Sequence, residues 1–207
     1  MKREDVIKVL ENFVKHRAED YDSGHDWWHI ERVRKLAERI NENEKLEDPF
    51  IVDVAALMHD TVDSKFYPEN SDQGYQLVRE LLIRTGLGEI EERIIHMIKN
   101  VSFSSRLKTD FQADPLLQII QDADKLDAMG AIGIARAFNY GGFRNNIIYS
   151  PYQGENQKST INHFYEKLLL LKSMMNTATG RDLANERHEF LEVYLKQFFK
   201  EWNEENL

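Results

Sequence analysis

The sequence predicts an all-α protein, and two observations support this fold class. Apolar residues recur at spacings of three and four over most of the 207 residues, whereas the alternation typical of strands is scarce. Asp48-Pro49 and Asp114-Pro115 each match the pattern of an N-cap acid followed by proline at the first helical position. Neither an internal repeat nor a linker-like composition divides the chain. We therefore expect a compact multi-helix bundle that forms one domain over residues 1–207.

The first half of the chain contains five segments with helical periodicity. The first segment places Leu10 and Val14 on one apolar face, and the second begins near Asp26. The third follows Asp48-Pro49, and the fourth ends before Gly86, since glycine favours the end of a helix. The expected helices are 3–18, 26–43, 49–60, 71–85 and 89–100, with a loop over 61–70.

The second half is expected to form four further helices and one long loop. Small residues from Gly130 onward indicate a tightly packed helix, which two glycines at 141–142 should end. The segment 145–157 contains a proline and a glycine and is predicted to be a loop. Loops of this length are uncommon in compact domains and are often functional. The expected helices are 116–127, 130–142, 160–176 and 180–202.

The composition excludes several classes of site. The chain has no cysteine, so disulfide scaffolds, zinc fingers, iron–sulfur clusters and cysteine nucleophiles are excluded, and a protein metal site must use His and carboxylates. With 27 basic and 36 acidic residues, the formal net charge is −9, which argues against a nucleic-acid groove. A small anionic substrate remains compatible, because a bound divalent cation reverses the local field.

No targeting or membrane-spanning segment is expected. The N-terminal residues carry acids and lack the apolar core of a secretory signal, and nowhere do about 18 apolar residues run together. We therefore expect a soluble cytoplasmic protein with no membrane partner. The oligomeric state stays open, with a homo-oligomer as one alternative.

Three expected helices each carry a His or Asp on an apolar stripe. His29, His59 and Asp124 each lie four residues from an apolar position of their own helix, and Asp60 follows His59 directly. A single inward histidine is more often a hydrogen-bonded core residue than a ligand. Buried carboxylates, however, need a cation or a donor nearby, and one shared metal would satisfy the whole set. Two imidazoles and two carboxylates suit manganese, iron, zinc, nickel or cobalt better than calcium.

The order His, His-Asp, Asp on helices resembles the HD-domain metal-dependent phosphohydrolases. Three longer runs are similar to the YpgQ-like bacterial branch of that family: HDTVDSKF at 59–66, DADKLDAMG at 122–130 and TINHFYEKL at 160–168. The similarity covers nearly the whole chain. It implies a compact HD-domain bundle whose metal ligands are His29, His59, Asp60 and Asp124.

The resemblance also implies catalytic residues near the HD pair. Asp63 occupies a position that in related enzymes orients or deprotonates the attacking water; without the resemblance it would be a solvated or capping loop acid. Lys65 fits a phosphate contact, although a plain surface lysine is an equal alternative. Asp127, one turn after Asp124, is expected either to orient a ligand or a water at the metal or to cap the end of its helix.

Four cationic or titratable residues are candidate substrate contacts, and for the two histidines among them a surface position is the alternative. His96 is the only histidine between the HD pair and the last ligand, which favours a substrate contact or surface role over a second metal. The full set is His96, Lys125, Arg144 and His163.

The function implied by the resemblance is hydrolysis of a phosphoester or phosphoanhydride of a nucleotide. A nucleoside or deoxynucleoside triphosphate pyrophosphohydrolase, which releases a monophosphate and pyrophosphate, is favoured. The alternatives are a nucleoside 5′-monophosphate phosphatase, a nucleotide- and metal-binding HD sensor without turnover, and a helical interaction module in which the His-Asp pair is coincidental. One divalent ion is expected, with Mn²⁺ favoured and Mg²⁺, Co²⁺, Ni²⁺, Fe²⁺ or Zn²⁺ as alternatives.

Overall fold

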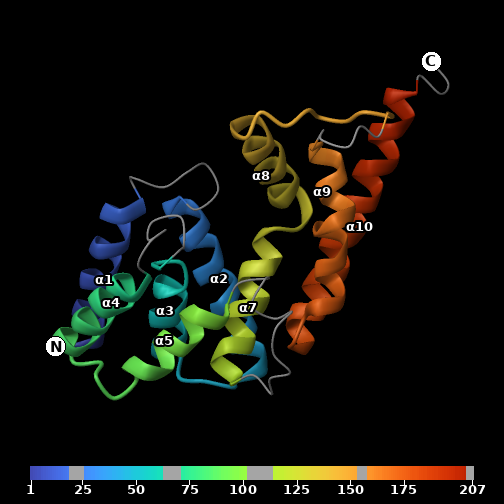
Figure 1. Ribbon diagram of the computed structural model, residues 1–207. Coiled ribbons are helices and arrows are strands. Elements are labelled where there is room, and N and C mark those ends of the chain that lie inside the picture. The colour runs from blue at the N-terminus through green and yellow to red at the C-terminus, as the bar shows by residue number, and fades with distance from the viewer. Residues whose placement is uncertain (19–25, 63–70, 102–113, 153–157, 204–207) are drawn as a thin grey trace. The chain divides into compact units, whose positions relative to one another are not determined.

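A computed structural model describes residues 1–18, 26–62, 71–101, 114–152 and 158–203, and over these ranges the secondary structure is helical, as predicted (Figure 1). The chain divides into two compact units, Met1–Asp124 and Lys125–Leu207. The expectation of one domain over residues 1–207 stays a prediction. None of the described helices is long and apolar enough to cross a membrane.

In the first unit, α3 is the central helix. It packs against α1, α2 and α5, and its residues from Val54 to Met58 are fully buried. Helix α4 packs on α5. The apolar composition of α3 therefore places its C-terminal end, and the His-Asp pair that follows, beside the core. The helices are α1 (Arg3–Ala18), α2 (Trp27–Glu44), α3 (Pro49–Met58), α4 (Ser71–Thr85), α5 (Glu91–Asn100) and α7 (Pro115–Asp127), of which α7 continues into the second unit.

The two predicted N-caps, Asp48 and Asp114, are confirmed, and Asp26 is a third N-cap. The Asp26 carboxylate accepts from the backbone N–H of His29 at 2.8 Å, Asp48 from Phe50 at 2.8 Å, and Asp114 from Leu116 at 3.0 Å. Each interaction satisfies a donor that the first turn of a helix leaves without an intrahelical partner. These caps fix the starting points of α2, α3 and α7.

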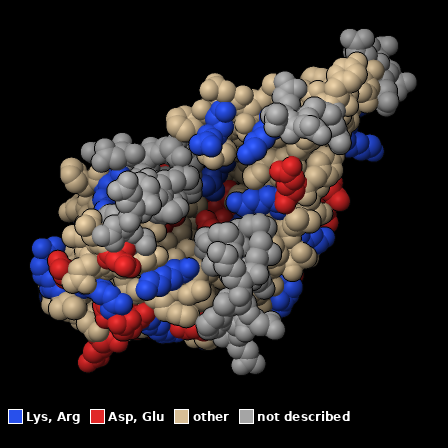
Figure 2. Space-filling model, in the orientation of Figure 1, with Lys and Arg blue, Asp and Glu red and all other residues tan. Residues whose placement is uncertain are grey.

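The second unit packs α8 (Gly130–Phe143) and the 3₁₀ segment η1 (Leu168–Met174) against α10 (Ala178–Trp202). The short helix α9 (Thr160–Glu166) packs on α8 and η1. A Cβ atom at Gly141 would lie 2.1 Å from Thr160 Oγ1, so this approach of α8 to α9 requires glycine. In both units, basic and acidic side chains are interspersed on the face drawn in Figure 2.

One predicted helix is divided in two. The expected helix 160–176 breaks at Lys167, where φ is −139° and ψ is −59°, and continues as η1. Residues three apart face the same side of a 3₁₀ helix, so Leu168 and Leu171 are both buried while Leu170 is 50% exposed. Four consecutive leucines gave no periodic signal that distinguished this geometry from an α-helix.

Candidate metal centre

The first unit brings a histidine to the start of α2. His29 is the third residue of that helix and only 1% exposed. Because the cap acid Asp26 accepts its backbone N–H, the helix start and the position of the imidazole are fixed together. The expectation that His29 points inward is confirmed.

A second buried histidine stands where α3 ends. His59 is 2% exposed, and its Nδ1 lies 2.7 Å from the carbonyl oxygen of Ala56. Since a carbonyl oxygen only accepts, Nδ1 carries the hydrogen, and in the neutral ring the lone pair is on Nε2. A backbone carbonyl that orients an imidazole in this way is common behind metal-binding histidines.

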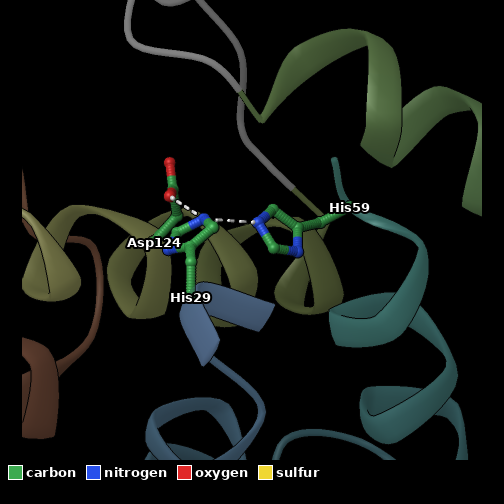
Figure 3. Close-up of side chains that lie close together, drawn as sticks. All are labelled: His29, His59 and Asp124. Atoms are coloured by element: carbon green, nitrogen blue, oxygen red, sulfur yellow. Dashed lines mark hydrogen bonds and ion pairs between the residues drawn. The ribbon is translucent and has the colours of Figure 1, made fainter. Parts of the chain in front are cut away.

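Three of the four predicted ligands converge. His59 Nε2 lies 3.3 Å from His29 Nε2, and Asp124 Oδ1 lies 3.6 Å from His29 Nε2 (Figure 3). One candidate ligand atom from each of the three residues lies within 4.8 Å of the other two. Two nitrogens that bind one cation at about 2.1 Å are roughly 3.0–3.4 Å apart in tetrahedral or octahedral geometry. The spacing and the two-nitrogen, one-oxygen donor set therefore fit a divalent transition metal, although 3.3 Å also fits a hydrogen bond between the two rings.

The remaining residues predicted near the metal are placed differently. Asp60 is half-buried with its Oδ2 atom buried, but it is not in the group of atoms within 4.8 Å of one another. Its role as a ligand stays a prediction. Asp63 and Lys65 lie outside the described residues, so their catalytic roles also stay predictions.

Asp127 has a partner of its own. It is 1% exposed, and its Oδ2 accepts from Arg136 Nη1 of α8 at 2.6 Å, within the second unit. A carboxylate paired with a guanidinium has a structural role irrespective of any metal.

The candidate substrate contacts differ in exposure. His96 is exposed on α5 in the first unit, whereas Lys125 is buried in the last turn of α7. Arg144 is exposed, with its guanidinium 6.0 Å from the centre of the Tyr140 ring. His163 is half-buried on α9; burial and then the charge of Lys167 lower its pKa against the opposing effect of Glu166. All four roles stay predictions.

Sequence reasoning missed polar contacts made by residues near the candidate ligands. The Ala56 carbonyl was detectable in principle, because a side chain at the end of a helix can reach the carbonyl three residues earlier. The ion pair between Arg34 of α2 and Asp53 of α3 was also missed, although Asp53 is a charged residue within the otherwise uncharged segment 49–58. A charge in such a segment indicates a partner, but the local sequence does not identify which one.

Comparison with known proteins agrees with these observations. Residues 27–129, which include His29, His59, Asp60 and Asp124, match the HD domain family. The chain is 42% identical to Bacillus subtilis YpgQ over 205 residues, which covers 97% of this chain and 96% of that relative.

Solved structures give the same result. An HD-superfamily hydrolase from Bacillus thuringiensis is 39% identical with a TM-score of 0.78, covering 98% of this chain and 99% of that one. A structure of Bacillus subtilis YpgQ in complex with ADP is 39% identical with a TM-score of 0.72, covering 92% and 97%. The chain therefore belongs to the HD-domain family, in its YpgQ-like branch, and as a member of that family it is a phosphohydrolase that depends on a divalent metal ion.

Proposed function

We propose that His29, His59 and Asp124 hold one divalent metal ion, with Asp60 as a fourth ligand. The observation that carries this proposal is the approach of His59 Nε2, His29 Nε2 and Asp124 Oδ1, together with the Ala56 carbonyl that directs the lone pair of His59 toward that point. Mn²⁺ is favoured, because a mixed set of nitrogen and oxygen ligands suits it. Among metals that fit such a set similarly well, cellular supply decides which one is bound. When bound, the ion supplies Lewis acidity to a phosphoryl oxygen and makes nearby water more acidic.

The proposed substrate is a nucleoside or deoxynucleoside triphosphate, hydrolysed to a monophosphate and pyrophosphate. Support comes from the YpgQ structure in complex with ADP, since that protein is 42% identical to this one over 97% of this chain. Asp63 would orient the attacking water or accept its proton, and Lys65 would stabilise negative charge on the phosphoryl oxygens. His96, Lys125, Arg144 and His163 are the proposed substrate contacts.

The test is a hydrolysis screen on the full-length protein. Purified protein is first analysed for metal content, then incubated with nucleoside mono-, di- and triphosphates and Mn²⁺, Mg²⁺, Co²⁺ or Ni²⁺, and phosphate and pyrophosphate are measured separately. We expect pyrophosphate from triphosphates, and a loss of more than about 100-fold in His59→Ala. His16→Ala is the matched control, because it removes an exposed imidazole from α1.

Each other result selects an alternative. Phosphate released from monophosphates would replace the proposal with a nucleotidase, and nucleotide binding without any turnover would replace it with a sensor. Retained hydrolysis in His59→Ala would refute the proposed metal set.

A further inference from the structure

We propose that Arg34 is a positioning residue for the metal ligands: it clamps α2 to α3 and so sets the separation of the His29 and His59 imidazoles. The inference rests on the metal set proposed above and adds a residue that does not itself touch the metal.

The clamp consists of four hydrogen bonds from one guanidinium. Arg34 Nε donates to Asp53 Oδ1 at 2.7 Å and Nη2 donates to Asp53 Oδ2 at 3.1 Å, which makes the contact with α3 bidentate. Nη1 donates to Glu31 at 2.8 Å and to Glu11 at 2.9 Å. One side chain thus connects α1, α2 and α3.

The clamp lies close to both imidazoles along the helices. Arg34 is five residues after His29 on α2, and Asp53 is six residues before His59, which follows α3 directly. At about 1.5 Å per residue, these separations are roughly 8 Å and 9 Å along the helix axes. A slide of α2 along α3 would therefore change the 3.3 Å separation of the ring nitrogens almost directly.

The environment keeps the Arg34 guanidinium charged. The Arg34 and Asp53 side chains are 17% and 32% exposed. Burial alone would lower the pKa of Arg34, but hydrogen bonds and the charges of Asp53 and Glu11 outweigh it and raise that pKa. The guanidinium is therefore protonated, as arginine side chains in proteins are.

Directionality distinguishes this contact from the apolar packing around it. Apolar burial between α2 and α3 is non-directional and tolerates small slides of one helix along the other. A bidentate arginine–carboxylate pair fixes both distance and orientation. Because a metal site needs its ligand atoms within about 0.5 Å of their working positions, the register set by Arg34 bears on metal affinity as well as on stability.

The experiment measures metal affinity in the full-length protein. Mn²⁺ binding is titrated for the wild type, Arg34→Gln, Asp53→Asn and the double variant, and the visible spectrum is recorded with saturating Co²⁺. We expect Arg34→Gln and Asp53→Asn each to weaken Mn²⁺ binding by about tenfold and to alter the Co²⁺ bands. The double variant should bind Mn²⁺ no more weakly than the worse single variant, because both changes remove the same ion pair. Arg34→Lys keeps the positive charge but loses the planar guanidinium that binds both oxygens of Asp53. Its Mn²⁺ affinity should therefore lie between those of the wild type and Arg34→Gln.

The matched control is Arg79→Gln. Arg79 of α4 pairs with Glu91 and Glu92 of α5, so it also joins two helices, but neither helix carries a proposed metal ligand. Its loss should lower the melting temperature without changing the Mn²⁺ affinity or the Co²⁺ spectrum.

Two outcomes would overturn the inference in distinguishable ways. If Arg34→Gln binds Mn²⁺ with wild-type affinity and gives the wild-type Co²⁺ spectrum, Arg34 is only structural and the proposed metal set stands. If Arg34→Gln does not fold, the same result in Arg34→Lys leads to the same conclusion. If the wild type itself binds none of these ions, the proposed metal set fails and the positioning role fails with it.

Discussion

Asp124 and Asp127 lie one turn apart on α7, yet their carboxylates have different kinds of partner. Asp124 Oδ1 lies 3.6 Å from the imidazole of His29, whereas Asp127 Oδ2 accepts from the guanidinium of Arg136 at 2.6 Å. A guanidinium is permanently charged and offers no lone pair, while a neutral imidazole offers one. A carboxylate beside an arginine is therefore already neutralised, and one beside two imidazoles completes a metal-binding donor set. The same residue type in one short motif thus serves a structural pair and a candidate metal site.

The largest expected effect is on metal binding. Asp124→Asn keeps the shape of the side chain but removes its charge, so we expect Mn²⁺ affinity to fall by more than about 100-fold. Loss of a residue that contacts a ligand but not the metal typically lowers the affinity by about 10- to 100-fold. The metal-free protein should melt near the wild-type temperature, since Asp124 is 31% exposed. Calorimetric titration and thermal melts in chelator measure both quantities, and wild-type affinity in this variant would remove Asp124 from the site.

The next effect is on stability. Asp127→Asn leaves Arg136 without its buried carboxylate, which we expect to lower the free energy of unfolding by about 2 kcal/mol, less than for a fully buried pair because Arg136 is 21% exposed. For a protein of this size, that corresponds to a drop of about 4–8 °C in melting temperature. Mn²⁺ affinity should be unchanged; a tenfold loss would show that Asp127 also acts on the metal site.

The smallest effect concerns a half-buried imidazole outside the cluster. The pKa of His163 is lowered in the folded state, so below its ordinary value of 6.5 the unfolded chain binds more protons. Stability is therefore lost as the pH falls from 6.5 toward the folded-state pKa. Urea unfolding in chelator at pH 7.5 and 5.5 should show a smaller loss for His163→Gln than for the wild type. His16→Gln is the control, and an identical loss in His163→Gln would contradict the assignment.

Local sequence predicted most of the helices well. The first helix was expected at 3–18 and is observed at Arg3–Ala18, because its apolar stripe and its boundary residues are local features. The division of 160–176 was not predicted, since Lys167 carries no helix-breaking signal. In the 3₁₀ segment that follows, Leu168 and Leu171 are both buried.

The site was predicted less completely than the fold. Helical spacing correctly gave inward faces to His29 and His59. It did not distinguish Asp124, whose carboxylate lies within the group of candidate ligand atoms, from Asp60, which follows His59 and lies outside that group. Asp60 follows the end of α3, where the direction of the chain and no longer a helical repeat decides where a side chain lies.

By itself, the sequence determined where most of the helices begin and end, which residues lie on apolar faces, and that any metal site must consist of His and carboxylate ligands. Only the tertiary structure decided which atoms meet: two ring nitrogens 3.3 Å apart across 30 residues of chain, an imidazole beside Asp124 and a guanidinium beside Asp127. The physical reason is that periodicity assigns a side chain to a face, whereas the distance between two faces depends on how separate helices pack and on directional contacts such as that of Arg34 with Asp53.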